Sequence, residues 1–119
     1  MANDSIIAIP LPGGGRINIK NPLISAYVHK TAAYTTRVGN HIIGVDTSGG
    51  TVIITLASIT VIAGRTIIIK DEGGQAAANN ITVATEGTET IDGNAANDVI
   101  NVNWEARGYY SDGTNWFKV

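Results

Sequence analysis

Short runs in which apolar and polar residues alternate recur along most of the chain. Within residues 51–56 the alternation places Val52, Ile54 and Leu56 on one face. A period of two residues is typical of β-strands. The residues between these runs are mostly Gly, Asp, Asn and Ser, which favour tight turns. From residue 26 onward the pattern predicts short strands about every ten positions, which is typical of a β-sandwich, jelly roll or barrel.

Some of the predicted strands are apolar on their second face as well. Ile53 alternates with the apolar residues of the 51–56 run, and Ile68 lies between Ile67 and Ile69. A strand that is apolar on both faces is usually covered on both faces. We therefore expect Ile53 and Ile68 to point away from the core of their own domain and toward a neighbouring subunit.

Two segments near the C-terminus give more specific predictions. Residues 100–104 alternate cleanly, so Ile100, Val102 and Trp104 are expected to point inward along a half-exposed strand. Asp112–Gly113 predicts a two-residue hairpin turn, with the glycine at positive φ.

The first 25 residues differ in composition from the rest of the chain. All three prolines and the Gly13–Gly15 run lie there, and residues 16–20 alternate as a short strand would. We interpret residues 1–25 as an extended N-terminal arm and residues 26–119 as a single β-sandwich or jelly-roll-like domain. Apolar side chains on such an arm need a groove to lie in, on their own domain, on a neighbouring subunit or on a binding partner. The expected anchors are Ile6, Ile7, Ile9, Leu11, Ile17 and Ile19.

Composition supports the all-β prediction and excludes several classes. Ile, Val and Thr fill 40 of the 119 positions, whereas Leu occurs three times, which excludes a helical protein. The absence of Cys excludes a disulfide scaffold, a thiolate zinc site and a cysteine nucleophile. A net charge of −2 with scattered Lys and Arg argues against nucleic acid. The apolar N-terminal run is broken by prolines, so neither a signal peptide nor a membrane span is expected.

Charged residues make up 15% of the chain, compared with about 25% in soluble domains. Because oligomer interfaces are depleted in charge, this favours a surface partly covered by other copies or by a larger assembly. A surface of neutral Asn, Thr and Ser is the alternative explanation.

No catalytic or metal-binding constellation stands out. The spacing of His29 and His41 does not match a metal-binding motif such as H-x-x-x-H. The G-x-S-x-G motif that carries the nucleophile of many hydrolases is absent. Residues 92–98 are rich in oxygen atoms, but Ala96 stands where an EF-hand needs a ligand. We expect no enzyme, no cofactor and no metal site.

Five of the seven aromatic residues lie in the last sixteen positions. Trp116 and Phe117 should lie on opposite faces of a terminal strand, so at most one of them can enter the core. The aromatic cluster permits two interpretations, which are core and subunit packing or a glycan-stacking surface. The residues expected at an interface or facing a glycan are Ile53, Ile68, Trp104, Tyr109, Tyr110 and Phe117.

The order of the turn motifs is recognisable. They occupy residues 45–52, 63–66, 69–74, 79–83, 87–93 and 110–116. Over roughly residues 34–119 this order resembles a β-module widespread in virion proteins of tailed bacteriophages. Residues 103–109 depart from the module, and the arm is not part of it.

The resemblance implies a trimer-forming β-sandwich on a virus particle, without catalytic residues. The predicted function is that of a capsid decoration (cement) protein, made in the host cytoplasm, whose homotrimer binds the major capsid protein on the virion exterior. The short chain beginning at Met1 favours a whole gene product of this kind. The alternatives are a tail-fibre or receptor-binding module that recognises a host surface glycan, and a non-viral carbohydrate-binding sandwich.

Overall fold

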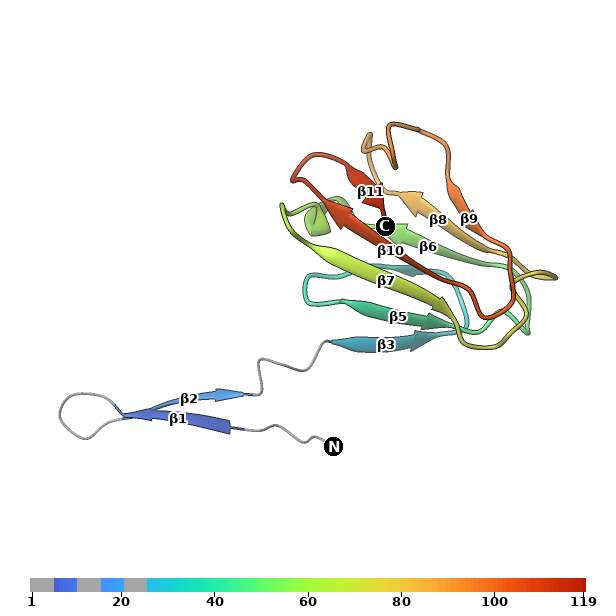
Figure 1. Cartoon of the computed structure of the whole chain (residues 1–119). Coiled ribbons are helices and arrows are strands. Elements are labelled where there is room, and N and C mark those ends of the chain that lie inside the picture. The colour runs from blue at the N-terminus through green and yellow to red at the C-terminus, as the bar shows by residue number, and fades with distance from the viewer. Residues whose placement is uncertain (1–5, 11–15, 21–25) are drawn as a thin grey trace.

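The computed structural model describes residues 6–10, 16–20 and 26–119, and almost all of their regular structure is strand (Figure 1). The predicted all-β class is therefore confirmed. In these ranges the one helical element is the 3-10 turn η1 (Ser58–Thr60). The strands are β1 (Ile6–Pro10), β2 (Arg16–Lys20), β3 (Tyr27–Lys30), β4 (Tyr34–Thr35), β5 (Ile42–Val45), β6 (Val52–Leu56), β7 (Thr66–Asp71), β8 (Ile81–Thr85), β9 (Asp98–Ile100), β10 (Ala106–Ser111) and β11 (Trp116–Lys118).

Strands β3 to β11 form two mixed sheets, of order β11-β10-β7-β5-β3 and β4-β6-β8-β9. From β3 to β8 the chain alternates between the sheets, so β5, β6, β7 and β8 each pair in parallel with the strand two places earlier. Strands β9, β10 and β11 then add antiparallel neighbours. The jelly-roll arrangement is not confirmed, because a jelly roll is built from antiparallel strands.

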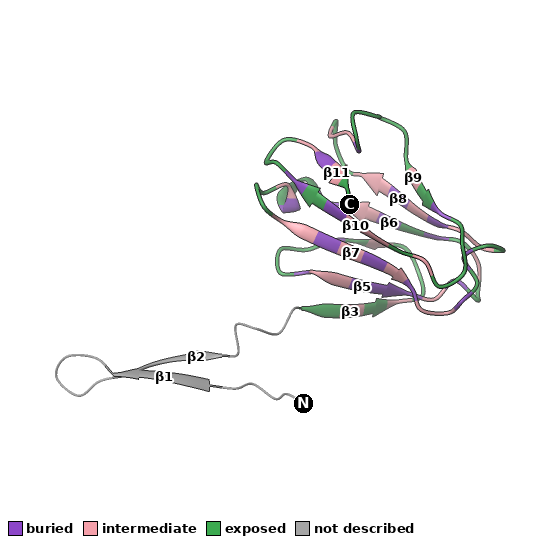
Figure 2. Ribbon diagram, in the orientation of Figure 1, coloured by how far each residue is buried: buried purple, intermediate pink, exposed green. Residues whose placement is uncertain are grey.

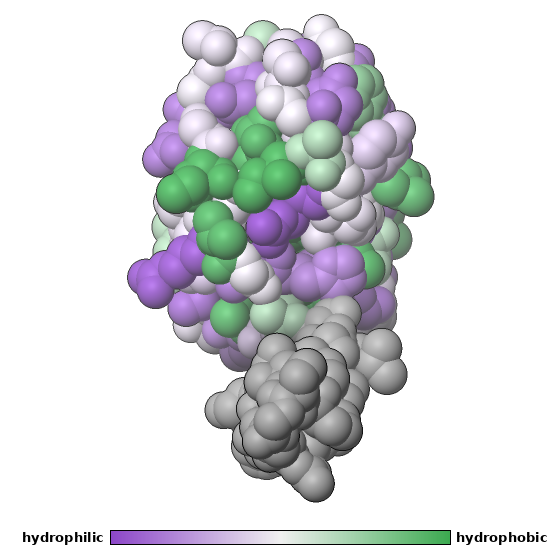
Figure 3. Space-filling view, turned by 90° about the vertical axis from the view of Figure 1, so that its left-hand side faces the viewer, coloured by the Kyte–Doolittle hydropathy of each residue, from purple (hydrophilic) through white to green (hydrophobic). Residues whose placement is uncertain are grey.

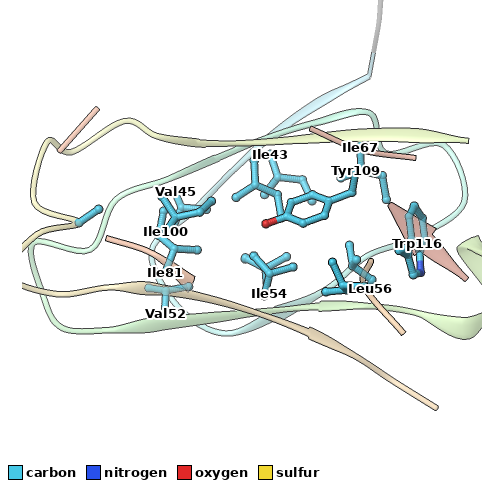
Figure 4. Close-up of a cluster of buried hydrophobic side chains, with 14 residues drawn as sticks. Ile43, Val45, Val52, Ile54, Leu56, Ile67, Ile81, Ile100, Tyr109 and Trp116 are labelled. Atoms are coloured by element: carbon cyan, nitrogen blue, oxygen red, sulfur yellow. The ribbon is translucent and has the colours of Figure 1, made fainter. Parts of the chain in front are cut away.

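The core lies between the two sheets. In Figure 4, Ile43 of the five-stranded sheet and Ile54 of the four-stranded sheet point toward each other, and both are fully buried. Burying an aliphatic side chain of this size is worth about 1.5–3 kcal/mol relative to leaving it exposed. The inward face predicted for residues 51–56 is confirmed, and Figure 2 shows the same alternation along β7. The largest fully buried side chains are Trp116, Tyr109, Ile43, Ile54, Leu56, Ile67, Ile69, Ile81, Ile100, Val45, Val52 and Val83.

The predicted strand over residues 100–104 is wrong beyond its first residue. β9 ends at Ile100, and Val102 and Trp104 are 58% and 59% exposed. The backbone of Trp104 has φ +66°, and its N–H donates to Asp71 Oδ2 at 2.9 Å. A left-handed residue held by a distant carboxylate cannot continue an extended strand, so both side chains leave the core.

The C-terminal hairpin has a longer loop than predicted. Ser111 pairs with Trp116, so four residues rather than two connect β10 to β11. The carboxylate of Asp112 accepts two backbone N–H groups within the loop, at 2.9 Å each. Gly113 has φ +97°, as predicted for this glycine.

Strands β1 and β2 pair antiparallel, with Ile6 opposite Lys20 and Pro10 opposite Arg16. The strand predicted over residues 16–20 is therefore confirmed. The predicted anchors fall in β1 and β2, except Leu11, which lies outside the described residues.

Candidate functional site

The outer face of the four-stranded sheet carries no charge at its central positions. Ile53, Thr82 and Val99 lie opposite one another on β6, β8 and β9. Ile53 is 49% exposed and Val99 is 37% exposed. Thr55 and Ala84 form the next pair on β6 and β8, and both are half-buried. We call these five residues the neutral face.

The outer face of the five-stranded sheet has a comparable row, in which Tyr27 is 52% exposed and Ile42 and Ile68 are half-buried. Tyr27, Ile42, Ile68 and Gly108 lie opposite one another across β3, β5, β7 and β10. Val119 approaches this row at Gly108, whose carbonyl oxygen accepts its N–H at 2.9 Å. Ile68 points away from the core, as expected, but its own chain leaves it only half-exposed.

Tyr110 and Phe117 stack on this same outer face. Their ring centroids are 5.4 Å apart with an interplanar angle of 25°, and Tyr110 is 43% exposed. Trp116 is fully buried while Phe117 is half-exposed, so one member of the terminal pair enters the core, as predicted.

Tyr109 lies inside the core instead of with the outward aromatic residues. Its hydroxyl donates to Asp98 Oδ2 at 2.7 Å, and Arg107 Nη1 donates to the same oxygen at 2.8 Å. Burial, reinforced by the hydrogen bond to Asp98, raises the pKa of Tyr109 above its ordinary value. Burial alone would raise the pKa of Asp98, but the hydrogen bonds from Tyr109 and Arg107 hold it below its ordinary value. Tyr109 therefore supports the fold and is not available to a glycan or another subunit.

The two histidines lie apart. His29 Nδ1 is 2.7 Å from Glu72 Oε1, which also accepts the hydroxyl of Tyr27 at 2.8 Å. The Glu72 carboxylate lies directly over Gly44, where a Cβ atom would overlap it. His41 Nδ1 is 2.8 Å from a backbone carbonyl oxygen. Neither arrangement resembles a catalytic pair with an activated nucleophile.

A pocket of about 150 Å³ is bounded by residues 91–98 and Lys118. Two side-chain oxygen atoms of this segment already have partners, because Asp92 Oδ1 accepts the N–H of Lys118 and Asn94 Oδ1 accepts a backbone N–H. The Lys118 ammonium is 3.4 Å from Asp98 Oδ1, where it would oppose a cation. Within the described ranges, no three His, Asp or Glu side chains are placed to hold a metal ion together.

Three exposed apolar side chains lie in the loops before β5 and β7, at the end of the two-sheet body that faces left in Figure 1. Val38 is 56% exposed, Ile59 is 68% exposed and Ile62 is 45% exposed. Their two loops contact each other, with Thr36 Oγ1 3.2 Å from Thr60 Oγ1. Figure 3 views this end and shows hydrophobic side chains gathered there into a patch. We call Val38, Ile59 and Ile62 the apolar end; the sequence pattern did not single them out.

The chain enters the two-sheet body at the apolar end. The carbonyl oxygen of Ala26 accepts the N–H groups of His41 and Ile42 at 3.1 and 2.9 Å. Both donors stand at the start of β5, directly after the loop that carries Val38. Ala26, the first residue of the two-sheet body that the structure describes, therefore lies beside the loop that carries Val38.

Trp104 is separated from the other exposed aromatic residues. Its indole ring lies against Gly74, whereas Tyr110 and Phe117 stack on the outer face of the five-stranded sheet. The structure thus divides the predicted aromatic cluster into a buried part and two distinct exposed parts.

Compared with protein-family models and with curated protein sequences, the chain gives no significant match. In the part of the chain that the structure describes, no helix has the length and apolarity needed to cross a membrane.

Proposed function

We propose that this chain is a structural virion protein, a capsid decoration (cement) protein that binds the outer surface of a bacteriophage capsid as a homotrimer. The order of its turn motifs, which resembles that of phage virion modules, supports the virion setting. In this proposal residues 26–119 act as one β-sandwich domain, and residues 1–25 act as the arm that reaches the shell or a sister subunit.

The neutral face is the observation that carries the proposal. Its two most exposed members, Ile53 and Val99, are aliphatic, and all five members are uncharged. When such a face packs against a neighbouring copy, none of its members is a charge that must be desolvated, and apolar area leaves water. Stable subunit contacts bury about 1,200–2,000 Å² in total, so the sheet face needs further surface from loops or arms.

The apolar end supports attachment to a shell. Val38, Ile59 and Ile62 are exposed, and Ala26 bonds to the residues directly after the loop that carries Val38. In this proposal the arm and the domain contact one partner together. Each trimer that bridges neighbouring capsid subunits stabilises the closed lattice by mass action, without changing the fold of the shell.

Light scattering on the purified protein tests the trimer. We expect a mass three times that of the single chain at micromolar concentration. Ile53→Lys places a charge at the centre of the neutral face and should give monomers, because burying an unpaired charge is costly. Ala95→Lys makes the same charge change on an exposed loop outside the neutral face and should leave the trimer intact. A trimer that tolerates Ile53→Lys would contradict this interface.

Binding to undecorated capsids tests the attachment. Deleting residues 1–15 should leave the thermal melt of the domain in place and weaken capsid binding. Unchanged binding would exclude the arm as a clamp, and a lost melt would show that the arm belongs to the folded core. Copy number per virion separates the two viral functions, because hundreds of copies fit a decoration protein and a few fit a tail fibre.

A further inference from the structure

Trp104 combines exposure with an unusual backbone conformation. Its side chain is 59% exposed, and its φ of +66° lies in the left-handed region that bulky residues rarely adopt. Such conformations persist only where the surroundings enforce them, and they concentrate at functional sites. An exposed ring contributes little to the core, so packing alone does not account for a tryptophan at this position.

The surroundings hold Trp104 from both sides of its backbone. Its N–H donates to Asp71 Oδ2 at 2.9 Å, and its carbonyl oxygen accepts the ammonium of Lys70. The fully buried Asp71 carboxylate also accepts the N–H groups of Gly73, Gly74 and Ala76, at 3.1–3.2 Å. The Asp71 carboxylate thus fixes both the turn after β7 and Trp104, which lies against that turn.

The turn forms a support for the indole ring. A Cβ atom at Gly74 would overlap ring atoms Cε2 and Cζ2 of Trp104, so the ring rests directly on the glycine backbone. Gly74 itself has φ +68°, which a glycine adopts without strain. The ring therefore lies directly against main chain, and the residue is nevertheless 59% exposed.

Hydrogen-bonding groups of two side chains lie close to the Trp104 backbone, from Lys70 at its carbonyl oxygen and from Asn103, the preceding residue. An ammonium has three N–H donors, and the contact with the Trp104 carbonyl uses one donor of Lys70. Asn103 is exposed, and its Oδ1 accepts the N–H of Ala77 at 2.9 Å, which fixes the amide and leaves its NH2 group as a further donor.

We propose that Trp104, with Lys70 and Asn103 beside it, binds one pyranose ring of a glycan. The axial C–H groups of a sugar stack on the indole face, and the two neighbouring side chains hydrogen-bond its hydroxyl groups. A flat, backed ring without a deep pocket suits a single sugar residue and not a buried small molecule. Binding to one chain is weak, and several copies on one assembly raise the avidity. The site does not depend on the capsid proposal.

The two tryptophans provide a direct assay, since Trp116 is fully buried and Trp104 is exposed. The probes are triacetylchitotriose, cellotetraose and maltotetraose, titrated into the full chain while the two indole N–H signals are followed by NMR. We expect at least one probe to shift the Trp104 signal with a Kd of about 1–10 mM, while the Trp116 signal stays in place.

Three variants separate a glycan site from a structural tryptophan. Trp104→Ala should abolish the binding, detected as loss of the other protein signal shifts, with the thermal melt retained. Gly74→Ala keeps the indole but displaces it, so binding should weaken at least several-fold. Tyr110→Ala removes a different exposed aromatic ring and should bind as the unchanged protein does.

Three results would overturn the proposal. The first is that none of the three oligosaccharides shifts the Trp104 signal, and the second is that binding survives Trp104→Ala. The third is a fall in oligomeric mass in Trp104→Ala without any saccharide effect, which would make Trp104 an interface residue instead. If Gly74→Ala fails to fold, Trp104→Phe provides the second test, because the smaller ring should bind more weakly at unchanged stability.

Discussion

Replacing Asp71 by asparagine should destabilise the structure although it hardly changes the shape of the side chain. Its carboxylate is fully buried and accepts four backbone N–H groups, from Gly73 and Gly74 on Oδ1 and from Ala76 and Trp104 on Oδ2. Asp71→Asn keeps the size of the side chain but leaves one acceptor oxygen. Each oxygen accepts one buried and one half-buried N–H, so one donor of each kind then faces an amide NH2 group that cannot accept it.

The magnitude follows from those two donors. A buried donor left without a partner costs about 1–3 kcal/mol and the half-buried donor costs less, so the free energy of unfolding should fall by about 1–4 kcal/mol. For a domain of this size each kcal/mol lowers Tm by about 4–8 °C. The loss should therefore reach at least about 4 °C in a thermal melt, with protein concentration held constant because oligomers melt in a concentration-dependent way.

The pH dependence gives a second readout. Burial alone would raise the pKa of Asp71, but the four N–H groups hold it below its ordinary value of 3.8. The stabilisation from this group is present above that value and is lost as the pH falls through the lower pKa of the folded state. The variant should lose part of the acid sensitivity of the unchanged protein, and Asp98 supplies another part.

Asp112→Asn is the matched control. Asp112 Oδ1 alone accepts two loop N–H groups, and Asp112 is exposed, so its replacement should cost less than about 1 kcal/mol. A loss below about 1 kcal/mol in Asp71→Asn would refute the reasoning, because it would mean that the four bonds do not hold the turn.

Two further predictions concern the C-terminal strands. Gly113→Val should lower stability by about 1–2 kcal/mol, because valine is strained at φ +97°; an unchanged melting temperature would contradict the assigned loop. Tyr109→Phe removes a buried hydroxyl donor from Asp98 and should cost about 1–2 kcal/mol. The pKa of Asp98 should rise as a result, so acid unfolding should begin at higher pH; an acid titration with the same midpoint as the unchanged protein would exclude this role.

The local pattern along the chain was sufficient for the class of fold and for several faces. Val52, Ile54 and Leu56 are buried and Ile53 is exposed, because the side-chain period of a strand is a local property. The positive φ of Gly113 followed equally from turn chemistry.

Where the local pattern gave a wrong or incomplete prediction, long-range contacts determined the structure. Residues 100–104 alternate like a strand, but an Asp71 oxygen, 33 positions away in the sequence, takes the N–H of Trp104 and ends the extended segment. Tyr109 and Tyr110 are adjacent aromatic residues, and sequence alone did not say which of them faces the core. Pairing with Ile67 on β7 places Tyr109 inward.

The candidate surfaces depend wholly on tertiary structure. Ile53, Thr82 and Val99 are far apart in the sequence and become neighbours because β6, β8 and β9 lie side by side. Turn residues specify that the chain changes direction, but they do not specify which sheet the next strand joins. Alternation between two sheets is fixed by hydrogen bonds between distant strands and by burial of one shared core, so only the folded chain brings these surfaces together.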